Sequence, residues 1–321
     1  MAEMLTREGA GEAAGDAAGG AGEATAGDAT PADAPPAHTS SGGAPLPIHD
    51  WGAEWRQLQT RRRRADDASF WDKRAPTFGT KDAPNPYVDR FFELARVLPG
   101  ESVLDMGCGT GALSVPLGAA GHHVIAADFS RGMLDVLQHE LAHHNVSSVT
   151  PVRMSWEDNW ATHGIGEGAV DVCMASRSIA VADLERALLR LTDTARRRVC
   201  VTLSTGASPR TDERALAAAG FEGMMWRDYL YAFNILAAHG LKPEISYIES
   251  ERYDTFATFD EAFEKYADMV RTSDAMLVAT QADIERGIER MRAWLTDQLV
   301  ENERAGEIDS HGEVQGALRL R

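Results

Sequence analysis

Three kinds of feature are scarce in this sequence, and each absence excludes a class of protein. Only three cysteines occur among 321 residues, namely Cys108, Cys173 and Cys200, and no two of them form a C-x-x-C pair. This spacing excludes a disulfide framework, a cysteine zinc site and an iron–sulfur cluster. No apolar run approaches the roughly 18 residues that would span a bilayer, and the N-terminus has neither a continuous apolar stretch nor a basic residue beyond Arg7. We therefore expect no membrane span and no secretory signal, and the expected location is cytoplasmic.

Basic residues are also outnumbered. The chain has 32 Lys and Arg against 49 Asp and Glu, which gives a formal net charge of −17. This balance opposes a surface that tracks nucleic acid phosphates or an anionic membrane. The apolar share of 44% is enough for a real core. The composition therefore favours a soluble globular protein with no nucleic acid and no membrane as partner, and it leaves the oligomeric state open.

The first 47 residues differ in composition from the rest. Residues 1–50 hold 14 Ala, 9 Gly and 5 Pro, with eight acidic side chains opposed only by Arg7. Such a segment cannot bury enough apolar surface to offset the entropy lost on ordering. We predict a disordered tail over residues 1–47.

The central part of the chain alternates short apolar runs with helical patterns. Apolar runs of this kind, buried on both faces, are typical of parallel strands joined by helices. We therefore predict an α/β fold with a doubly wound, mostly parallel sheet. The expected strands are 103–106, 124–127, 149–154, 170–175, 199–204 and 245–248, and the expected helices are 112–120, 133–145, 183–195 and 228–239.

Helical additions flank this sheet on both sides. Trp51, Trp55 and Leu58 recur at helical spacing, and residues 87–97 form a further helical pattern, so residues 48–96 are expected to form an N-terminal helical cap. The α/β domain is expected over residues 97–255. A capping box at 258–261 opens the first of two amphipathic helices, which predicts a C-terminal helical appendage over residues 256–321 with a possible last strand at 314–320.

The most informative stretch is a strand that runs into a glycine-rich turn and then a helix. Glycine at Gly107 and Gly109 lets the backbone turn tightly and approach a ligand closely. Asp128, 21 residues beyond Gly107, ends the next strand. A carboxylate there can accept both hydroxyl hydrogens of a ribose. The pattern also satisfies a dinucleotide fingerprint, so an NAD-dependent oxidoreductase is an alternative. Asp105 would repel a pyrophosphate and attract a cationic amino group, which favours a different nucleoside ligand.

These residues resemble the class I S-adenosylmethionine-dependent methyltransferases. The resemblance covers roughly residues 97–250, and Phe-Trp-Asp-Lys-Arg-Ala at 70–75 looks like the segment that precedes the cofactor domain in a group of small bacterial and archaeal members. The matching motifs are Val-Leu-Asp-Met-Gly-Cys-Gly-Thr-Gly at 103–111, Val-Ile-Ala-Ala-Asp-Phe-Ser-Arg-Gly-Met-Leu at 124–134 and Val-Asp-Val-Cys-Met-Ala-Ser at 170–176.

The resemblance implies a role for each matching position. Asp105, Gly107, Cys108 and Gly109 would line the methionine part of S-adenosyl-L-methionine. Asp128 would hold the ribose, and Phe129 would lie against the adenine. Trp156 or Glu157 would contact the adenine amino group. Ser176 would end the strand toward which the transferring methyl group points.

Other interpretations of the same residues stay open. Asp128 could cap the helix that follows it, Trp156 could belong to the core, and Arg177 could pair with Asp171 or Asp183. Cys108 could merely fill space in the turn. The histidine pairs 122–123 and 143–144 are not expected to hold a metal, because neighbouring residues on a helix do not face one site.

The expected chemistry needs no covalent nucleophile, because a sulfonium already activates its methyl group. Such an enzyme aligns acceptor, methyl group and sulfur and excludes water, so no catalytic residue can be named from the sequence. The motif typical of exocyclic amine methylation is absent after the fourth strand, which with the acidic charge favours a small-molecule acceptor. Aromatic residues such as Trp55 and Tyr231 could cover it or belong to the core. A non-catalytic sensor or scaffold that binds the same cofactor is a further alternative.

Overall fold

The computed structural model describes residues 2–8, 49–60, 67–78, 85–205, 212–221, 227–248, 254–273, 279–301, 303, 305 and 318–320. Residues 1–9 and 51–321 form one compact unit, and residues 10–50 are grouped separately. Most of the segment 1–47, for which the sequence predicts disorder, lies outside the described residues.

Five parallel strands form the main sheet, as the sequence predicts. They are β2 (Val103–Met106), β3 (Val124–Asp128), β4 (Val149–Arg153), β5 (Val170–Ser176) and β6 (Ala195–Ser204). Their spatial order is β4-β3-β2-β5-β6, with every neighbouring pair parallel. The order reverses between β2 and β5, and in open α/β sheets the ligand crevice lies at the carboxyl ends of the strands beside such a switch point. The doubly wound fold class is therefore confirmed.

Two further strands complete this sheet beside β6. β7 (Glu244–Ile248) agrees with the predicted sixth strand, whereas β1 (Ala2–Glu8) was not expected. β1 lies between β6 and β7 and is antiparallel to both. For these seven residues the structure differs from the disorder predicted for the tail. They contain neither proline nor glycine, the two residue types that weaken a strand interior. They can therefore form backbone hydrogen bonds with β6 on one side and β7 on the other.

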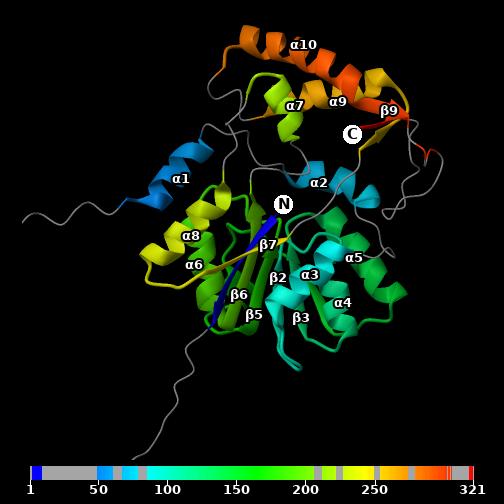
Figure 1. Ribbon diagram of the computed structural model, residues 1–321. Helices are drawn as coiled ribbons and strands as arrows, with labels where there is room; N and C mark the ends of the chain where they lie inside the picture. The colour runs from blue at the N-terminus through cyan, green and yellow to red at the C-terminus, as the bar shows by residue number, and fades with distance from the viewer. Residues whose placement is uncertain are drawn as a thin grey trace, which may run out of the picture. The chain divides into compact units, whose positions relative to one another are not determined.

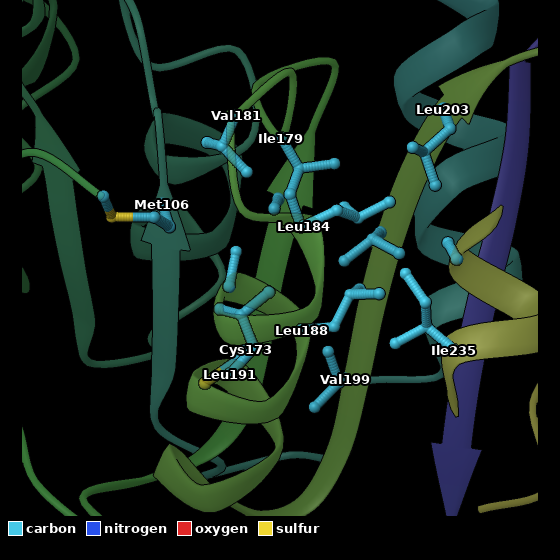
Figure 2. Packing of buried hydrophobic residues seen from close by; sticks show 14 of the residues in the cluster. Met106, Cys173, Ile179, Val181, Leu184, Leu188, Leu191, Val199, Leu203 and Ile235 are labelled. Atoms are coloured by element: carbon cyan, nitrogen blue, oxygen red, sulfur yellow. The ribbon is translucent and has the colours of Figure 1, made fainter. Parts of the chain in front are cut away.

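Helices cover both faces of the sheet, and alternate residues of each strand face opposite cores. On one face, α3 (Pro86–Ala95), α4 (Ser114–Ala119) and α5 (Arg131–His143) enclose a cluster that includes Val103 of β2. On the other face, α6 (Leu184–Thr194) and α8 (Asp228–Ala238) enclose a cluster that includes Leu104 and Met106 of the same strand. Figure 1 shows the two groups of helices on opposite sides of the strands, and Figure 2 shows α6 leucines packed against side chains of β5 and β6.

The N-terminal helices extend these cores. α1 (Trp51–Gln59) packs on α8, where the Trp55 ring lies edge-on to Tyr231 at 5.5 Å and its indole N–H donates to the Val181 carbonyl at 2.9 Å. Trp55 is 1% exposed, so the core interpretation is correct for this pair. α2 (Ala68–Arg74) and the short 3-10 helix η1 (Ala75–Thr77) follow. Both contact α5.

The C-terminal elements have a hydrophobic cluster of their own. α7 (Glu213–Ala218), α9 (Phe259–Thr272) and α10 (Gln281–Gln298) supply most of it, with Phe256 from β8 (Thr255–Phe256). The predicted N-cap is present, because the Thr258 hydroxyl accepts from the Glu261 N–H at 3.2 Å. The reciprocal half of the predicted capping box differs, since the Glu261 carboxylate accepts from the Ala257 N–H at 2.7 Å. β10 (Leu318–Leu320) lies between β8 and β9 (Leu299–Glu301), so part of the possible last strand is formed, while residues 314–317 lie outside the described residues. The predicted boundaries at 97 and 255 stay predictions.

Candidate functional site

The glycine-rich turn after β2 is anchored to the end of β3. The N–H groups of Gly107 and Cys108 both donate to the Ala127 carbonyl, at 2.7 and 3.0 Å. Gly107 and Gly109 have φ values of +76° and +55°, in the left-handed region that favours glycine. A Cβ at Gly107 would lie 2.2 Å from the Cβ of Ser178, which follows β5. The turn therefore requires glycine at Gly107 for both conformation and space.

Asp128 joins this turn to the start of α5. One of its carboxylate oxygens accepts from the Gly109 N–H at 2.9 Å, and the other accepts from the Ser130 N–H at 2.9 Å. The side chain is 6% exposed. Burial raises the pKa of Asp128, and the hydrogen bonds from Ser130 and Gly109 act in the opposite direction. The N-cap of α5 is Ser130, so Asp128 is not the simple helix cap of the alternative interpretation. Each oxygen keeps a second lone pair for a ligand hydroxyl.

Asp105 places a second carboxyl group beneath the turn. It is 1% exposed, and the Ser114 hydroxyl donates to it at 2.7 Å. Burial raises the pKa of Asp105 to about 6, the Ser114 hydrogen bond lowers it, and the nearby Asp128 charge raises it further. The structure thus brings Asp105, Asp128 and the glycine turn to one place at the carboxyl ends of β2 and β3, as the motif spacing predicts.

The raised pKa of Asp105 predicts an unusual pH dependence of stability. Because the folded carboxyl titrates near pH 6 rather than at the ordinary 3.8, folding favours the protonated form. The contribution of Asp105 to the free energy of unfolding is therefore fully present at low pH and is lost as pH rises through this window. We expect Asp105→Asn to remove that slope and to raise the unfolding midpoint at neutral pH.

Thermal denaturation from about pH 4 to about pH 7 checks this expectation. Asp135→Asn is the matched control, since Asp135 is an exposed acid that pairs with Arg131 on the surface of α5. Equal slopes in wild type and Asp105→Asn would contradict the assignment.

Asp72 of α2 is a site residue that motif reasoning did not single out. Its carboxylate accepts from the Ser130 hydroxyl at 2.6 Å and from the Gly132 N–H at 2.8 Å. The Ser130 hydrogen bond is the main reason why the pKa of Asp72 is lowered. The only sequence signal was the resemblance of residues 70–75 to an upstream family segment. Asp72 thus links this segment to the start of α5. Its partner Ser130 stands two residues after Asp128.

The same segment lies over the glycine turn. Phe78 follows η1, and its ring atom Cε1 lies 3.6 Å from where a Cβ of Gly109 would be. The Thr110 hydroxyl lies 3.5 Å from the Phe78 carbonyl oxygen. A ligand bound on this turn would therefore contact the Phe78 ring.

Residues at the ends of β4 and β5 form the next part of the site. The Trp156 indole N–H donates to the Ser178 carbonyl at 2.9 Å, and the Ser178 hydroxyl donates to the Met106 carbonyl at 2.5 Å. Trp156 is half-buried and also packs on the core around Trp160. Both interpretations of Trp156 thus find support, because it borders the turn and the core at once. Glu157 is exposed.

Phe129 and Ser176 occupy the expected strand ends. Phe129 is half-buried directly after β3, and its carbonyl accepts from Arg153 Nε at 3.4 Å. The Ser176 hydroxyl lies 2.6 Å from the Tyr87 hydroxyl, which also lies 2.9 Å from the Thr202 hydroxyl. Tyr87 was not identified from the sequence, and its helical pattern gave no sign of this contact.

Cys108 behaves as a packed residue. It is 7% exposed, and burial together with the charges of Asp105 and Asp128 raises the pKa of its thiol well above the ordinary value. A thiol held protonated is a poor nucleophile. Cys108 is therefore packed in the turn and does not act as a nucleophile.

The histidines at the far end of α5 lie closer together than expected. Glu140, His143 and His144 each offer a ligand atom, and all three atoms lie within 4.8 Å of one another. The argument that adjacent histidines do not face one site is therefore wrong for this pair. The prediction that the protein uses no metal stays a prediction.

Within the part of the chain that the structure describes, no helix combines the length and apolar character needed to cross a bilayer. The expected cytoplasmic location is not tested by this finding.

This chain is similar in part to several known proteins. Residues 103–197 match the family model described as "Methyltransferase domain". An uncharacterized protein of Haemophilus influenzae is 34% identical over 183 residues, which are 56% of this chain and 66% of that protein. Demethylmenaquinone methyltransferase of Clavibacter sepedonicus is 56% identical over 43 residues, which are 13% of this chain and 18% of that protein. The solved phosphoethanolamine N-methyltransferase 1 of Haemonchus contortus, in complex with phosphoethanolamine and S-adenosylhomocysteine, is 16% identical with a TM-score of 0.36 and covers 50% of this chain and 34% of that one.

The family match confirms the resemblance drawn from the motifs, because it covers the glycine turn, Asp128 and the end of β5 together. Residues 103–197 of this chain are therefore similar to a methyltransferase domain. The match to curated relatives spans just under two thirds of the first protein and less than a fifth of the second.

Proposed function

We propose that this protein transfers a methyl group from S-adenosylmethionine to a small-molecule acceptor by direct in-line displacement. The observation that carries the proposal is the carboxylate of Asp128, buried at the end of β3 and hydrogen-bonded to the Gly109 N–H of the turn. This hydrogen bond brings the backbone of the glycine turn and the proposed acceptor of the ribose hydroxyls together at the carboxyl ends of β2 and β3.

The residues present fit a sulfonium nucleoside better than a dinucleotide. Gly107 and Gly109 have positive φ values of +76° and +55°, the conformation in which a glycine turn can place its backbone against a ligand. Asp105 and Asp128 are both buried beside it. Two carboxyl groups would repel a pyrophosphate, whereas they favour a ligand that carries an amino group and a sulfonium.

Each residue then has a definite task. Asp128 would accept the ribose hydroxyls, and Phe129 would lie against the adenine. Of Trp156 and Glu157, the Glu157 carboxylate would accept from the adenine amino group, because the Trp156 indole N–H only donates and is bonded to the Ser178 carbonyl. Asp105, Gly107, Cys108 and Gly109 would line the methionine part, and Ser176 would border the place of transfer. S-adenosylmethionine supplies the activated methyl group, so the protein has to bind, align and exclude water.

Two measurements on the full chain test the proposal. In isothermal titration, S-adenosylmethionine and its demethylated product are expected to bind, and NAD is not; tight NAD binding without a response to the other two would favour an oxidoreductase. Incubation with a cell extract and methyl-labelled cofactor is expected to label a small compound. Binding without any labelled product would favour the sensor or scaffold instead.

A further inference from the structure

Arg177 has an unusual backbone conformation at the edge of this site. Its φ is +57°, although it is not glycine. The two other non-glycine residues with positive φ among those described, Arg96 and Asn145, stand just after helices, where the left-handed conformation is common. Arg177 instead follows a strand, β5, and the Thr202 hydroxyl accepts from its N–H at 2.9 Å. Strained residues of this kind cluster at ligand sites.

The side chain of Arg177 rests on a rigid platform. Its guanidinium carbon lies 3.6 Å from the centre of the Tyr87 ring. Tyr87 is 7% exposed, and its hydroxyl lies within hydrogen-bond distance of both Ser176 and Thr202. Stacking on an aromatic face leaves the N–H donors at the edge of the guanidinium plane. The platform therefore fixes the direction in which Arg177 can donate.

Neither of the two acids that the sequence suggests as partners of Arg177 pairs with it. Asp171 pairs with Arg196 at 2.7 Å, and Asp183 lies 3.5 Å from Arg56. The interpretation that Arg177 pairs with one of these acids is therefore wrong. Across the described ranges of the chain, Arg177 has no carboxylate within ion-pair distance, although the protein carries a net charge of −17. An exposed, oriented arginine without an internal counter-ion suits an anion that arrives from outside.

The position of Arg177 connects it with the glycine turn. The residue before it, Ser176, ends β5, and β5 is the neighbour of β2. The residue after it, Ser178, donates to the Met106 carbonyl and lies against Gly107. Arg177 thus stands at the carboxyl ends of the strands beside the switch point, where the acceptor has to approach the cofactor.

We propose that Arg177 binds an oxyanion on the methyl acceptor, so that the acceptor is an anionic small molecule that carries a carboxylate or a phosphate. This inference rests on the proposed methyltransferase function. A guanidinium recognises either group with two parallel N–H donors. Arg177 positions the acceptor and selects its charge, and it takes no part in bond making.

The first test follows labelled methyl groups from S-adenosylmethionine into the small-molecule fraction of a cell extract. Mass spectrometry of the labelled product of the wild-type protein is expected to show a phosphate or a carboxylate, the latter free or methyl-esterified, and phosphatase treatment releases the phosphate only in the first case. A labelled product that contains neither group would overturn the inference while leaving the proposed function intact. Absence of any labelled product would instead count against the function.

The second test compares variants in a methyl-transfer assay. The substrate is the acceptor itself, which is the unmethylated form of the labelled product. Arg177→Gln is expected to raise the KM for this acceptor by roughly tenfold or more, with the affinity for S-adenosylmethionine changed less than about twofold. Arg177→Lys keeps the charge but lacks the planar guanidinium group. Its KM is expected to lie between the values of the wild type and Arg177→Gln. Arg96→Gln is the matched control, since Arg96 is also exposed with a positive φ of 49° but ends α3. An unchanged KM in Arg177→Gln would overturn the inference.

Discussion

Gly107→Ala is expected to destabilise the protein by roughly 2 to 6 kcal/mol and to abolish binding of S-adenosylmethionine at ordinary concentrations. Two costs add up. An L-residue at a φ of +76° is strained, by about 1 to 3 kcal/mol. The new Cβ would also lie 2.2 Å from the Ser178 Cβ and 2.7 Å from its hydroxyl oxygen, and relieving such an overlap costs a further 1 to 3 kcal/mol or so. Urea denaturation and isothermal titration measure the two effects.

Gly164→Ala separates conformational strain from steric overlap. Gly164 has a similar φ of +74°, and nothing lies within 4 Å of the place where its Cβ would be. We expect this variant to show the strain alone and to bind S-adenosylmethionine normally. In the double variant Gly107→Ala with Ser178→Gly, the overlapping Cβ is gone, so part of the lost stability should return. If Gly107→Ala were no less stable than Gly164→Ala, the close approach of the turn to Ser178 would be disproved.

Asp128→Ala is expected to weaken binding of S-adenosylmethionine by one to a few kcal/mol, or about 5- to 100-fold or more in the dissociation constant. The change removes the acceptor proposed for the ribose hydroxyls. It also leaves the Gly109 and Ser130 N–H groups without their carboxylate partner, so the turn loses its connection to α5. Isothermal titration measures the affinity, and denaturation reports the accompanying loss of stability.

Asp171→Asn shows whether lost stability alone explains such a result. Asp171 lies near the start of β5, accepts from the Ser102 N–H and hydroxyl, and pairs with Arg196. Its removal should lower stability without changing cofactor affinity, because these contacts lie at the amino end of the strands. Equal affinity in Asp128→Ala and wild type would refute the ribose assignment.

The parts of the site that the sequence could predict are those that follow one another along the chain. A buried strand, a glycine turn and a strand-ending acid recur at fixed spacing, and parallel pairing of β2 with β3 then brings Gly107 and Asp128 together. Position in the sequence was enough here, because neighbouring parallel strands end at the same edge of the sheet.

Contacts made across the fold could not be predicted in this way. Asp72 reaches Ser130 only because α2 packs on α5, and Tyr87 reaches Ser176 and Thr202 only because α3 covers the ends of β5 and β6. Likewise, Asp171 and Asp183 were plausible partners for Arg177 by distance along the chain. Asp171 lies near the start of β5 and Arg177 after its end, and the two acids pair with Arg196 and Arg56 instead. Such choices depend on packing between elements, which local patterns do not encode.

The attachment of α2 to α5 has a consequence for kinetics. Residues 67–78 contact the glycine turn through Phe78. The Asp72 carboxylate holds them to the start of α5 by two hydrogen bonds. A nucleoside bound on the turn would contact Phe78, so we expect the exchange of the nucleoside to be coupled to loosening of residues 67–78. Departure of the spent cofactor, rather than the chemical step, would then set the pace of turnover.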